Sequence, residues 1–495
     1  MILKRLLIAN RGEIACRIVR ACRDRGITSI AVFSEHDRNA LHVRMADEAV
    51  ALDGATAAET YLDIDTLVSA AREARADAVH PGYGFLSERA AFAEALERAG
   101  IVFVGPPSDV IARMGSKTDA RALAVSAGVP VVPGALASGQ DDAAIAKAVR
   151  GVGLPALIKA SAGGGGKGMR VVRTEAEIEG AVGAARREAL AAFGDGTLYV
   201  ERLIERPRHV EIQVIADTHG RAVHLFERDC SVQRRHQKVV EESPSPGVTP
   251  ALRARMGAAA VALTRAAGYV NAGTLEFLVE GEGDDAAFYF LEMNTRLQVE
   301  HPVTEIVTGV DLVQAQLDVA EGRPLPWAEE ALSQRGHAIE CRVYAEAPEQ
   351  GFLPQAGRIL HWEQPSGPGV RVDAGFETGS EITVHYDPLL AKLIVGGATR
   401  DEAIRRALRA LDEFIILGVR TNVAFLGSVL RSDAFQKGAV HTRWADESID
   451  GLTPPAPEAL AEAAALAARE AAQESGSATG RPVPDPWGAL AGWRP

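Results

Sequence analysis

The sequence is poor in lysine and cysteine and has no long apolar run. Eight of its 53 basic residues are lysines and the other 45 are arginines, so each lysine is a candidate for a specific role. The four cysteines include no CxxC pair, which excludes a disulfide framework and a thiolate zinc site. No apolar run reaches the roughly 18–20 residues of a membrane-spanning helix. After Lys4-Arg5 only residues 6–9 are apolar, which is too short for a secretory signal, so we expect a cytoplasmic protein.

Negative charge exceeds positive charge by 13, from 53 basic and 66 acidic residues. This balance argues against nonspecific binding to nucleic acid or to an anionic membrane. The hydrophobic fraction of 47% and the charged fraction of 24% exclude a disordered chain, a collagen and a coiled-coil rod. The 495 residues exceed the ~100–200 of one domain, so we expect two or three domains.

Short apolar runs alternate with amphipathic helical stretches in the first part of the chain. This alternation predicts a mixed α/β fold that begins with a parallel, doubly wound sheet. The strand candidates are residues 4–9, 29–33, 48–52, 76–80 and 101–104, and the first helix is expected over 14–25. Gly105-Pro106-Pro107 closes this unit, so the first boundary is expected near residue 113.

The remainder of the chain divides near residue 335. The expected helices are 116–128, 309–321 and 401–416, and the expected strands are 337–344, 358–361 and 381–386. The last part differs in composition, with an Ala/Glu-rich helix candidate at 457–473 and a Gly/Ser/Pro-rich linker at 475–486.

Four consecutive glycines, residues 163–166, lie between two apolar segments, 156–160 and 169–172. They do not form a P-loop, because with Lys167 as the motif lysine the Ser/Thr position falls on Gly168. Both flanks are typical of strands, so we expect a hairpin whose tip offers backbone N–H groups to a polyphosphate. A flexible surface turn is the alternative.

Two lysines favour the phosphate-binding interpretation. Lys159 ends an apolar strand, where lysine is rarely buried unless it is paired, and a phosphate beside the glycine tip explains it better than an exposed strand end. Lys117 lies at a helix start, where a cation opposes the helix dipole unless an anion lies close by.

Two acidic residues interrupt the apolar strands of a second predicted hairpin, 273–279 and 288–294. Alternation predicts one shared face for residues 274, 276 and 278, and one for residues 288, 290, 292 and 294. If the strands pair in register, Glu276, Glu292 and Asn294 converge as an all-oxygen site suited to Mg²⁺ bridging ATP phosphates. The alternative is that one or both acids face solvent at a sheet edge.

Polar residues continue at every second position after this hairpin, at 292, 294, 296, 298 and 300. Oxygen ligands, a guanidinium, an amide and a carboxylate suit a small planar anion beside a metal–phosphate centre, with a base next to it. A solvated strand face would explain the polarity but not the mixture. The basic segment 228–238 is either a solvated loop or an anion-binding surface, and its Cys230 is expected to be a small buried residue.

Together these segments closely resemble biotin carboxylase, the ATP-grasp component of biotin-dependent carboxylases. The matching stretches are 8–15, 80–88, 159–169, 227–238, 292–305 and 340–343. The most specific is 294–302, Asn-Thr-Arg-Leu-Gln-Val-Glu-His-Pro, because other ATP-grasp enzymes share the Glu-x-Asn element but not this extension. The resemblance runs from residue 1 to about 448.

The resemblance implies three domains and a tail. They are a Rossmann-like N-terminal domain at 1–113, an ATP-grasp domain at 114–334 with a mobile glycine-rich lid at about 131–204, an α+β C-terminal domain at 335–448, and a helix and linker tail at 449–495.

The resemblance also implies roles for individual residues. Those implied to contact ATP are Lys117, Lys159, Gly163, Gly164, Gly165, Gly166, Glu201, His209, Gln233 and His236, with the backbone of Arg202 and Ile204. Those implied to hold Mg²⁺ or Mn²⁺ are Glu276, Glu292 and Asn294, and those implied to bind bicarbonate are Lys238, Arg296, Gln298, Val299 and Glu300. Glu300 would remove the bicarbonate proton, so that carboxyphosphate forms and then yields CO₂ and phosphate. Arg342 would bind biotin and stabilise its enolate. Arg202 stands where lysine is common in the family.

Biotin is expected on a partner, because the last lysine is Lys437 and no methionine follows Met293. The expected partners are a biotin carboxyl carrier protein or domain, a second copy of this chain and a carboxyltransferase subunit. Two other functions stay open: an ATP-grasp ligase with an amine or acid acceptor, and an inactive nucleotide-binding scaffold. The complete set of charged site residues argues against the scaffold.

Overall fold

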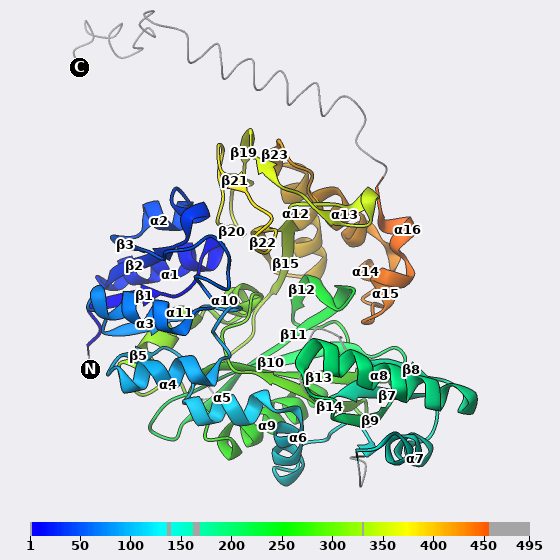
Figure 1. The fold of residues 1–495 in the computed structure, drawn as a ribbon. Coiled ribbons are helices and arrows are strands. Elements are labelled where there is room, and N and C mark those ends of the chain that lie inside the picture. Colours follow the sequence, from blue (N-terminus) through cyan, green and yellow to red (C-terminus); the bar gives the residue numbers. More distant parts are fainter. Residues whose placement is uncertain (1, 136–139, 162–168, 329–330, 455–495) are drawn as a thin grey trace, which may run out of the picture.

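The computed structural model describes residues 2–135, 140–161, 169–328 and 331–454, and it has the mixed α/β architecture that the sequence predicts. In Figure 1 the N-terminal unit (blue) lies to one side of a large central sheet, the C-terminal elements (yellow to orange) lie above it, and the unit around β7–β9 lies at the opposite lower side. Within the described ranges, no helix is long and apolar enough to cross a membrane.

The N-terminal unit is a five-stranded parallel sheet in the order β3-β2-β1-β4-β5, as predicted. Its elements are β1 (Arg5–Ile8), α1 (Gly12–Arg25), β2 (Thr28–Phe33), α2 (Leu41–Met45), β3 (Glu48–Ala51), α3 (Ile64–Glu73), β4 (Ala78–His80), α4 (Ala90–Arg98) and β5 (Val102–Phe103). The Asn10 amide, after β1, donates to the carbonyls of Pro81 and Tyr83, after β4, at 2.7 Å each. These two loops are therefore fixed to each other at the carboxyl edge of the sheet, where such sheets bind ligands.

The centre of the molecule is an eight-stranded antiparallel sheet in the order β14-β13-β10-β11-β12-β15-β22-β20. Its strands are β10 (Arg208–Ala216), β11 (Ala222–Arg234), β12 (Gln237–Ser243), β13 (Asn271–Glu280), β14 (Ala287–Asn294), β15 (His337–Tyr344), β20 (Val370–Ala374) and β22 (Leu389–Gly397). Because β12 pairs with β15, the sheet continues across residue 335, where the sequence predicts a division between two units.

Two helices, α9 (Pro250–Ala266) and α12 (Arg400–Asp412), cover one face of the large sheet (Figure 1). Met256 of α9 packs in a core cluster with Ile212 and Leu275. Ile404 of α12 packs in a second cluster with Leu393. Because side chains alternate across a strand, the polar residues between these apolar ones point to the opposite face. Alternation thus collects charged residues from most strands of this sheet on a single surface.

A four-stranded sheet, in the order β6-β9-β7-β8, forms a separate unit with two helices. Its elements are β6 (Gly134–Ala135), α7 (Asp142–Val152), β7 (Ala156–Ala160), β8 (Arg170–Val172), α8 (Ile178–Phe193) and β9 (Leu198–Arg202). β7 and β8 pair antiparallel, which confirms the predicted hairpin. The predicted glycine tip, Gly163 to Gly166, lies outside the described residues.

The predicted helix at 309–321 is wrong in its start, because two helices meet there. α10 (His301–Thr308) ends at Gly309, whose φ of 73° lies in the left-handed region that favours glycine. α11 (Leu312–Ala320) then begins, and the Asp311 side chain accepts from the backbone N–H of Gln314 as its N-cap. Gly309 and the N-cap residue Asp311 therefore separate two helices, although the residues on both sides of them are apolar.

Other predicted bounds near the C-terminus also differ from the structure. The predicted strand 358–361 is two short strands, β18 (Gly357–Arg358) and β19 (His361–Glu363), and the predicted strand 381–386 is reduced to β21 (Glu381–Ile382). The predicted helix 401–416 ends earlier, at Asp412, and the apolar residues after it form β23 (Ile415–Leu417). The remaining helices are α5 (Ser108–Gly115), α6 (Lys117–Ser126), α13 (Val423–Arg431), α14 (Asp433–Gln436), α15 (Trp444–Glu447) and α16 (Ile449–Leu452).

Candidate active site

The predicted carboxylate hairpin is confirmed, with one correction to its faces. Glu276 on β13 lies directly opposite Glu292 on β14, and Thr274 lies opposite Asn294. The register shifts between Glu276 and Phe277, however, so Phe277 pairs with Phe290. This β-bulge puts residues 288 and 290 on the apolar face while 292 and 294 reach the charged face, so the prediction that all four share one face is wrong.

Lys238, on β12, is the centre of the charged face. Its Nζ lies 2.6 Å from Glu211 Oε2, 2.7 Å from Glu276 Oε1 and 2.7 Å from Glu300 Oε1. Burial alone would lower the pKa of Lys238, but the three carboxylates outweigh burial and raise it well above its usual value. The ammonium is therefore permanently charged and ties three strands or turns to one point.

Glu300 is fully buried and touches two cations. Its Oε1 accepts from Lys238 and its Oε2 accepts from Arg342 Nη2 at 2.9 Å. Burial would raise the pKa of Glu300, but the charges of Lys238, Arg342 and Arg228 hold it well below the usual range. Glu300 is consequently a carboxylate at neutral pH, able to accept a proton.

Arg342, on β15, has its own carboxylate partner in addition to Glu300. Glu241 Oε1 lies 2.5 Å from the guanidinium. Burial raises the pKa of Glu241 to about 7, and the charge of Arg342 opposes this rise. Arg342 is held between two buried carboxylates, so its planar donors have a fixed direction.

Five of the predicted ATP-contacting residues line one cavity of about 380 Å³. Those lining it are Lys117, Lys159, His209, Gln233 and His236, together with Lys238, Glu276, Glu292, Asn294, Arg296, Gln298, Val299 and Arg342. Glu201 pairs with two cations. Its Oε2 lies 2.5 Å from Lys159 Nζ, and its Oε1 lies 2.9 Å from Arg121 Nη1. The lysine of β7 and the charged face of the large sheet thus line one cavity.

Two other predicted ATP-contacting residues lie beside a different hollow. Arg202 and Ile204 line a cavity of about 450 Å³ with residues of the β9 end. The Arg202 side chain makes a bidentate pair with Glu280 at 2.9 and 2.7 Å. Its guanidinium is therefore occupied by Glu280, and its backbone N–H donates to the Pro133 carbonyl at 2.8 Å.

The oxygen-rich end of the cavity fits a divalent cation. Glu276, Glu292 and Asn294 offer carboxylate and amide oxygens, the ligand type that Mg²⁺ prefers. Burial and the neighbouring Glu276 both raise the pKa of Glu292, so a bound cation would relieve the repulsion. His209, Glu211 and Glu276 also bring three ligand atoms within 4.8 Å of one another, but the Lys238 ammonium lies among them and disfavours a metal there.

The predicted polar row is not a continuous strand. β14 ends at Asn294, and the chain then turns toward α10, which has Glu300 as its N-cap residue. Arg296 Nη1 donates to Gln298 Oε1 at 2.7 Å and Arg296 Nη2 donates to Asn294 Oδ1 at 3.0 Å. Residues 292, 294, 296 and 298 of the row still line the cavity, and Glu300 contacts two of its lining residues, Lys238 and Arg342.

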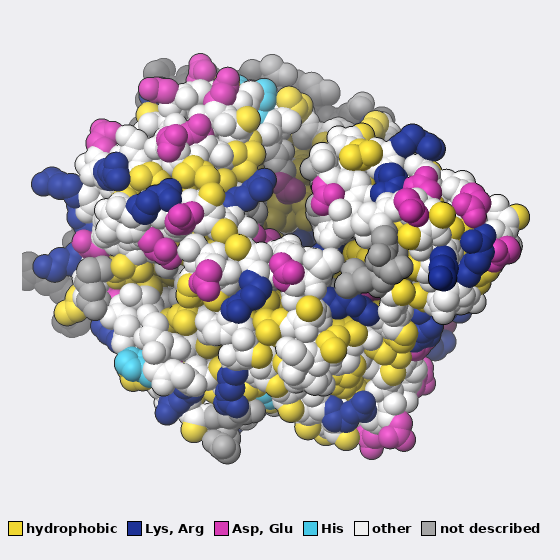
Figure 2. Space-filling view, turned by 60° about the horizontal axis from the view of Figure 1, so that its bottom comes forward, with side chains coloured by type: hydrophobic (Ala, Val, Ile, Leu, Met, Phe, Trp, Pro, Cys, Tyr) yellow, Lys and Arg dark blue, Asp and Glu magenta, His cyan; other side chains and the backbone are white. Residues whose placement is uncertain are grey.

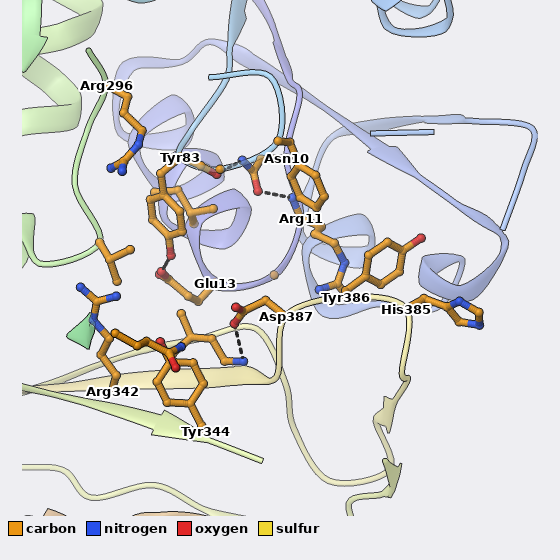
Figure 3. A pocket seen from close by; sticks show the side chains of 17 residues that line it. Asn10, Arg11, Glu13, Tyr83, Arg296, Arg342, Tyr344, His385, Tyr386 and Asp387 are labelled. Carbon is orange, nitrogen blue, oxygen red and sulfur yellow. Dashed lines mark hydrogen bonds between the residues drawn. The ribbon is translucent and has the colours of Figure 1, made fainter. Parts of the chain in front are cut away.

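A second cavity, of about 480 Å³, adjoins the first and shares four lining residues with it: Gln237, Arg296, Val299 and Arg342. Figure 3 shows Tyr83 and Glu13 pointing toward each other from the N-terminal unit, with Arg342 and Tyr344 rising from a strand on the other side. The Tyr83 hydroxyl donates to Glu13 Oε1. Arg342 thus lies where the two cavities meet.

Charges of both signs are mixed over the face shown in Figure 2, and the surface there is hollowed. The concentrated charge lies instead on the buried face of the large sheet. Sequence reasoning gave no role to four members of this face, Glu211, Arg228, Glu241 and Lys392, nor to Glu13 and Tyr83 of the N-terminal unit, although Arg228, Glu13 and Tyr83 lie in segments that it singled out. The available signal was a charged residue at alternating positions of an apolar strand, as in Glu211 and Lys392.

Three family models match consecutive parts of the chain. They are the N-terminal domain of biotin carboxylase over residues 2–111, the ATP binding domain of the carbamoyl-phosphate synthase L chain over 116–328, and the biotin carboxylase C-terminal domain over 340–447.

Similar proteins cover nearly the whole chain. The biotin carboxylase of Haemophilus influenzae is 49% identical over 448 residues, which are 90% of this chain and 99% of that protein. The alpha chain of the mitochondrial methylcrotonoyl-CoA carboxylase of Dictyostelium discoideum is 46% identical over 493 residues, 99% of this chain and 70% of that protein.

A solved structure shares the fold. It is the biotin carboxylase domain of the Hydrogenobacter thermophilus 2-oxoglutarate carboxylase, a dimer in complex with MgADP, ADP and bicarbonate. It superposes with a TM-score of 0.88 at 43% identity and covers 92% of this chain and 100% of that one. From its sequence, its fold and the family models that it matches, this chain belongs to the biotin carboxylase family.

Proposed function

We propose that this chain carboxylates biotin with ATP and bicarbonate, the first half-reaction of an acyl-CoA carboxylase. One observation carries the proposal: Glu300 is ion-paired with Lys238 in the first cavity and with Arg342 at the junction with the second. A base in this position serves two reactants that enter from different sides and meet at one point.

The first cavity suits a nucleotide and its metal. Lys117, Lys159, His209, Gln233 and His236 supply donors for the phosphates, and glycines 163–166, Glu201 and the backbone of Arg202 and Ile204 are proposed to complete the ATP site. Glu276, Glu292 and Asn294 would hold Mg²⁺ or Mn²⁺, which neutralises charge on the transferred phosphoryl group when bound.

Bicarbonate would lie against Lys238, Arg296, Gln298 and the Val299 backbone. Glu300 takes its proton as the bicarbonate oxygen attacks the γ-phosphorus, the bond to the β-phosphate oxygen breaks, and ADP leaves. The carboxyphosphate then divides into CO₂ and phosphate. Lys238 stabilises the negative charge that builds up, because a fixed ammonium in a buried site needs no reorganisation.

Biotin would enter through the second cavity. The released phosphate takes the proton from its ureido nitrogen N1′, and the nitrogen then attacks CO₂. Arg342 faces the position of the developing enolate oxygen and donates from two nitrogens.

The strength of Glu300 as a base depends on its neighbours. Lys238 and Arg342 keep its pKa low while the cavities hold no substrate. When bicarbonate and biotin engage these two cations, their hold on Glu300 weakens and its basicity rises. Proton removal is therefore coupled to the presence of both reactants.

The proposed domains at 1–113, 114–334 and 335–448 are supported by the limits of the family models, and 449–495 is proposed as a tail. A biotin carboxyl carrier, a second copy of the chain and a carboxyltransferase subunit are the proposed partners. A cytoplasmic location stays a prediction of the sequence, since several similar proteins are named as mitochondrial.

The decisive measurement is phosphate release from MgATP by the purified chain, with and without bicarbonate and with and without free biotin. Release that requires bicarbonate and increases with biotin is expected. Nucleotide binding without bicarbonate-dependent release would contradict the proposal and favour a ligase with another acceptor.

A further inference from the structure

Lys392 is a fully buried lysine that none of the proposed steps uses. It lies on β22 directly opposite Arg342 of β15, so the two cations share the charged face of the sheet. Burying an ammonium is unfavourable unless the protein supplies partners, so the contacts of this side chain show what it does.

The Lys392 ammonium touches three groups. Its Nζ donates to the carbonyl of Val299 at 2.9 Å and lies 3.2 Å from Glu13 Oε1 and 4.0 Å from Asp373 Oδ2. Burial would lower the pKa of Lys392, but Glu13, Glu340 and Asp373 raise it above its usual value. The group therefore stays charged, and it joins the N-terminal unit to the turn after β14 and to the C-terminal strands.

The contact with Val299 bears on the proposed base. Val299 immediately precedes Glu300, and its carbonyl lies beyond the end of β14, where no sheet ladder holds it. Val299 also lines both cavities. A shift of this carbonyl would move the Glu300 side chain, and with it the Val299 backbone that is proposed to contact bicarbonate.

The contact with Glu13 bears on the second cavity. Glu13 accepts from the Tyr83 hydroxyl, and Lys392 Nζ itself lies 5.9 Å from the centre of the Tyr83 ring. The other carboxylate oxygen of Glu13, Oε2, is buried without a hydrogen-bond partner, so Lys392 is important for holding this acid in place. Figure 3 shows the Tyr83 and Glu13 pair on the cavity wall.

We propose that Lys392 is a positioning residue for biotin carboxylation, which fixes the Val299–Glu300 turn and, through Glu13, the Tyr83 wall of the second cavity. The inference rests on the proposed function, because it assigns a task within that reaction. It predicts that the two contacts can be separated: loss of the Val299 contact affects bicarbonate, and loss of the Glu13 contact affects biotin.

The test compares K392M and E13Q with the parent chain in the phosphate-release assay, with bicarbonate and biotin varied in turn. For K392M we expect the KM for bicarbonate to rise about tenfold and kcat to fall about tenfold, since a small misplacement of a reacting group has effects of this size. The Kd for ADP, measured by calorimetry, should stay within about twofold. For E13Q we expect the KM for biotin to rise and the KM for bicarbonate to stay unchanged.

R400M is the matched control. Arg400 is a partly buried cation of the same C-terminal unit, and it pairs with Glu242 at 2.7 and 3.0 Å, away from both cavities. Loss of this cation should lower stability without changing either KM.

A K392M variant with kcat and both KM values like the parent would overturn the inference, as would an R400M variant with the same kinetic change as K392M. If K392M does not fold, E13Q decides: an unchanged KM for biotin contradicts the inference. A parent chain that releases no phosphate in response to bicarbonate would overturn the proposed function, and this inference with it, whereas an active parent with unaffected variants counts against the inference alone.

Discussion

The two ends of the charged face balance their charges differently. At one end Glu300 is paired with both Lys238 and Arg342, and its pKa is held low. At the β13–β14 end, Glu276 and Glu292 lie opposite each other, and burial together with this repulsion raises the pKa of Glu292. The protein itself supplies the cations for Glu300 and, through Lys238, for Glu276, whereas Glu292 favours an added cation. Substitutions at the two ends should therefore differ in sign as well as in size.

The largest effect is expected from E300Q, at the end of the charged face where Lys238 and Arg342 pair with the acid. The substitution removes the proposed base, so bicarbonate-dependent phosphate release should fall about a thousandfold. ADP binding, measured by calorimetry, should stay within about twofold because Glu300 does not line the phosphate cavity. Full activity of E300Q would remove this residue from the mechanism.

A smaller but more selective effect is expected from R342M. Stimulation of phosphate release by biotin should fall roughly a hundredfold, the size found for loss of one donor to a developing oxyanion. Release without biotin should fall much less, because Lys238 still contacts Glu300. Equal losses with and without biotin would show that Arg342 acts only through Glu300.

The stability of the metal-free chain provides the sharpest test of the comparison. E292Q removes a repelled charge and should raise the melting temperature, while it increases the Mg²⁺ concentration needed for activity about tenfold. E300Q leaves Lys238 and Arg342 less compensated and should lower the melting temperature. Thermal unfolding of both variants without metal checks this, and shifts of the same sign would contradict the comparison.

The pH dependence of the E300Q effect has a definite sign. Because the pKa of Glu300 is lower in the folded chain than in the unfolded one, its stabilising contribution is present above the unfolded value and is lost as pH falls. The stability difference between the parent and E300Q should therefore shrink on acidification below about pH 4.3, the ordinary value for a glutamate. Urea unfolding at several pH values measures this difference.

The smallest effect is expected from R202K, which lies outside the charged face. In the Arg202–Glu280 pair both side chains are about one-third exposed, and such ion pairs contribute little to the free energy of unfolding. If the ligand contact is through the backbone, the Kd for ADP should change less than about twofold. A large loss of affinity would show that the guanidinium itself takes part.

The local pattern was sufficient for much of the fold. Alternation of strands and helices predicted the parallel N-terminal sheet. Period-two polarity predicted that Glu276 and Glu292 converge if the two strands pair in register, and they lie directly opposite each other. It failed where one residue changed the pattern. The bulge at residue 291, between Phe290 and Glu292, reversed the face of two phenylalanines, and Gly309 ended α10 so that the helix predicted from residue 309 begins only at Leu312.

The sequence by itself determined which apolar strands carry charged residues at alternating positions. The two-residue period of a strand and the need to bury one of its faces depend only on neighbouring residues, so this pattern can be found without the fold. Only the tertiary structure decided how these residues meet. Pairing of β12 with β15 carried the sheet across residue 335 and brought Arg342 to Glu300, and the same sheet put Lys392 beside Val299 and Glu13. Those contacts join residues far apart in the chain, and their register depends on the long-range strand pairing of the whole sheet.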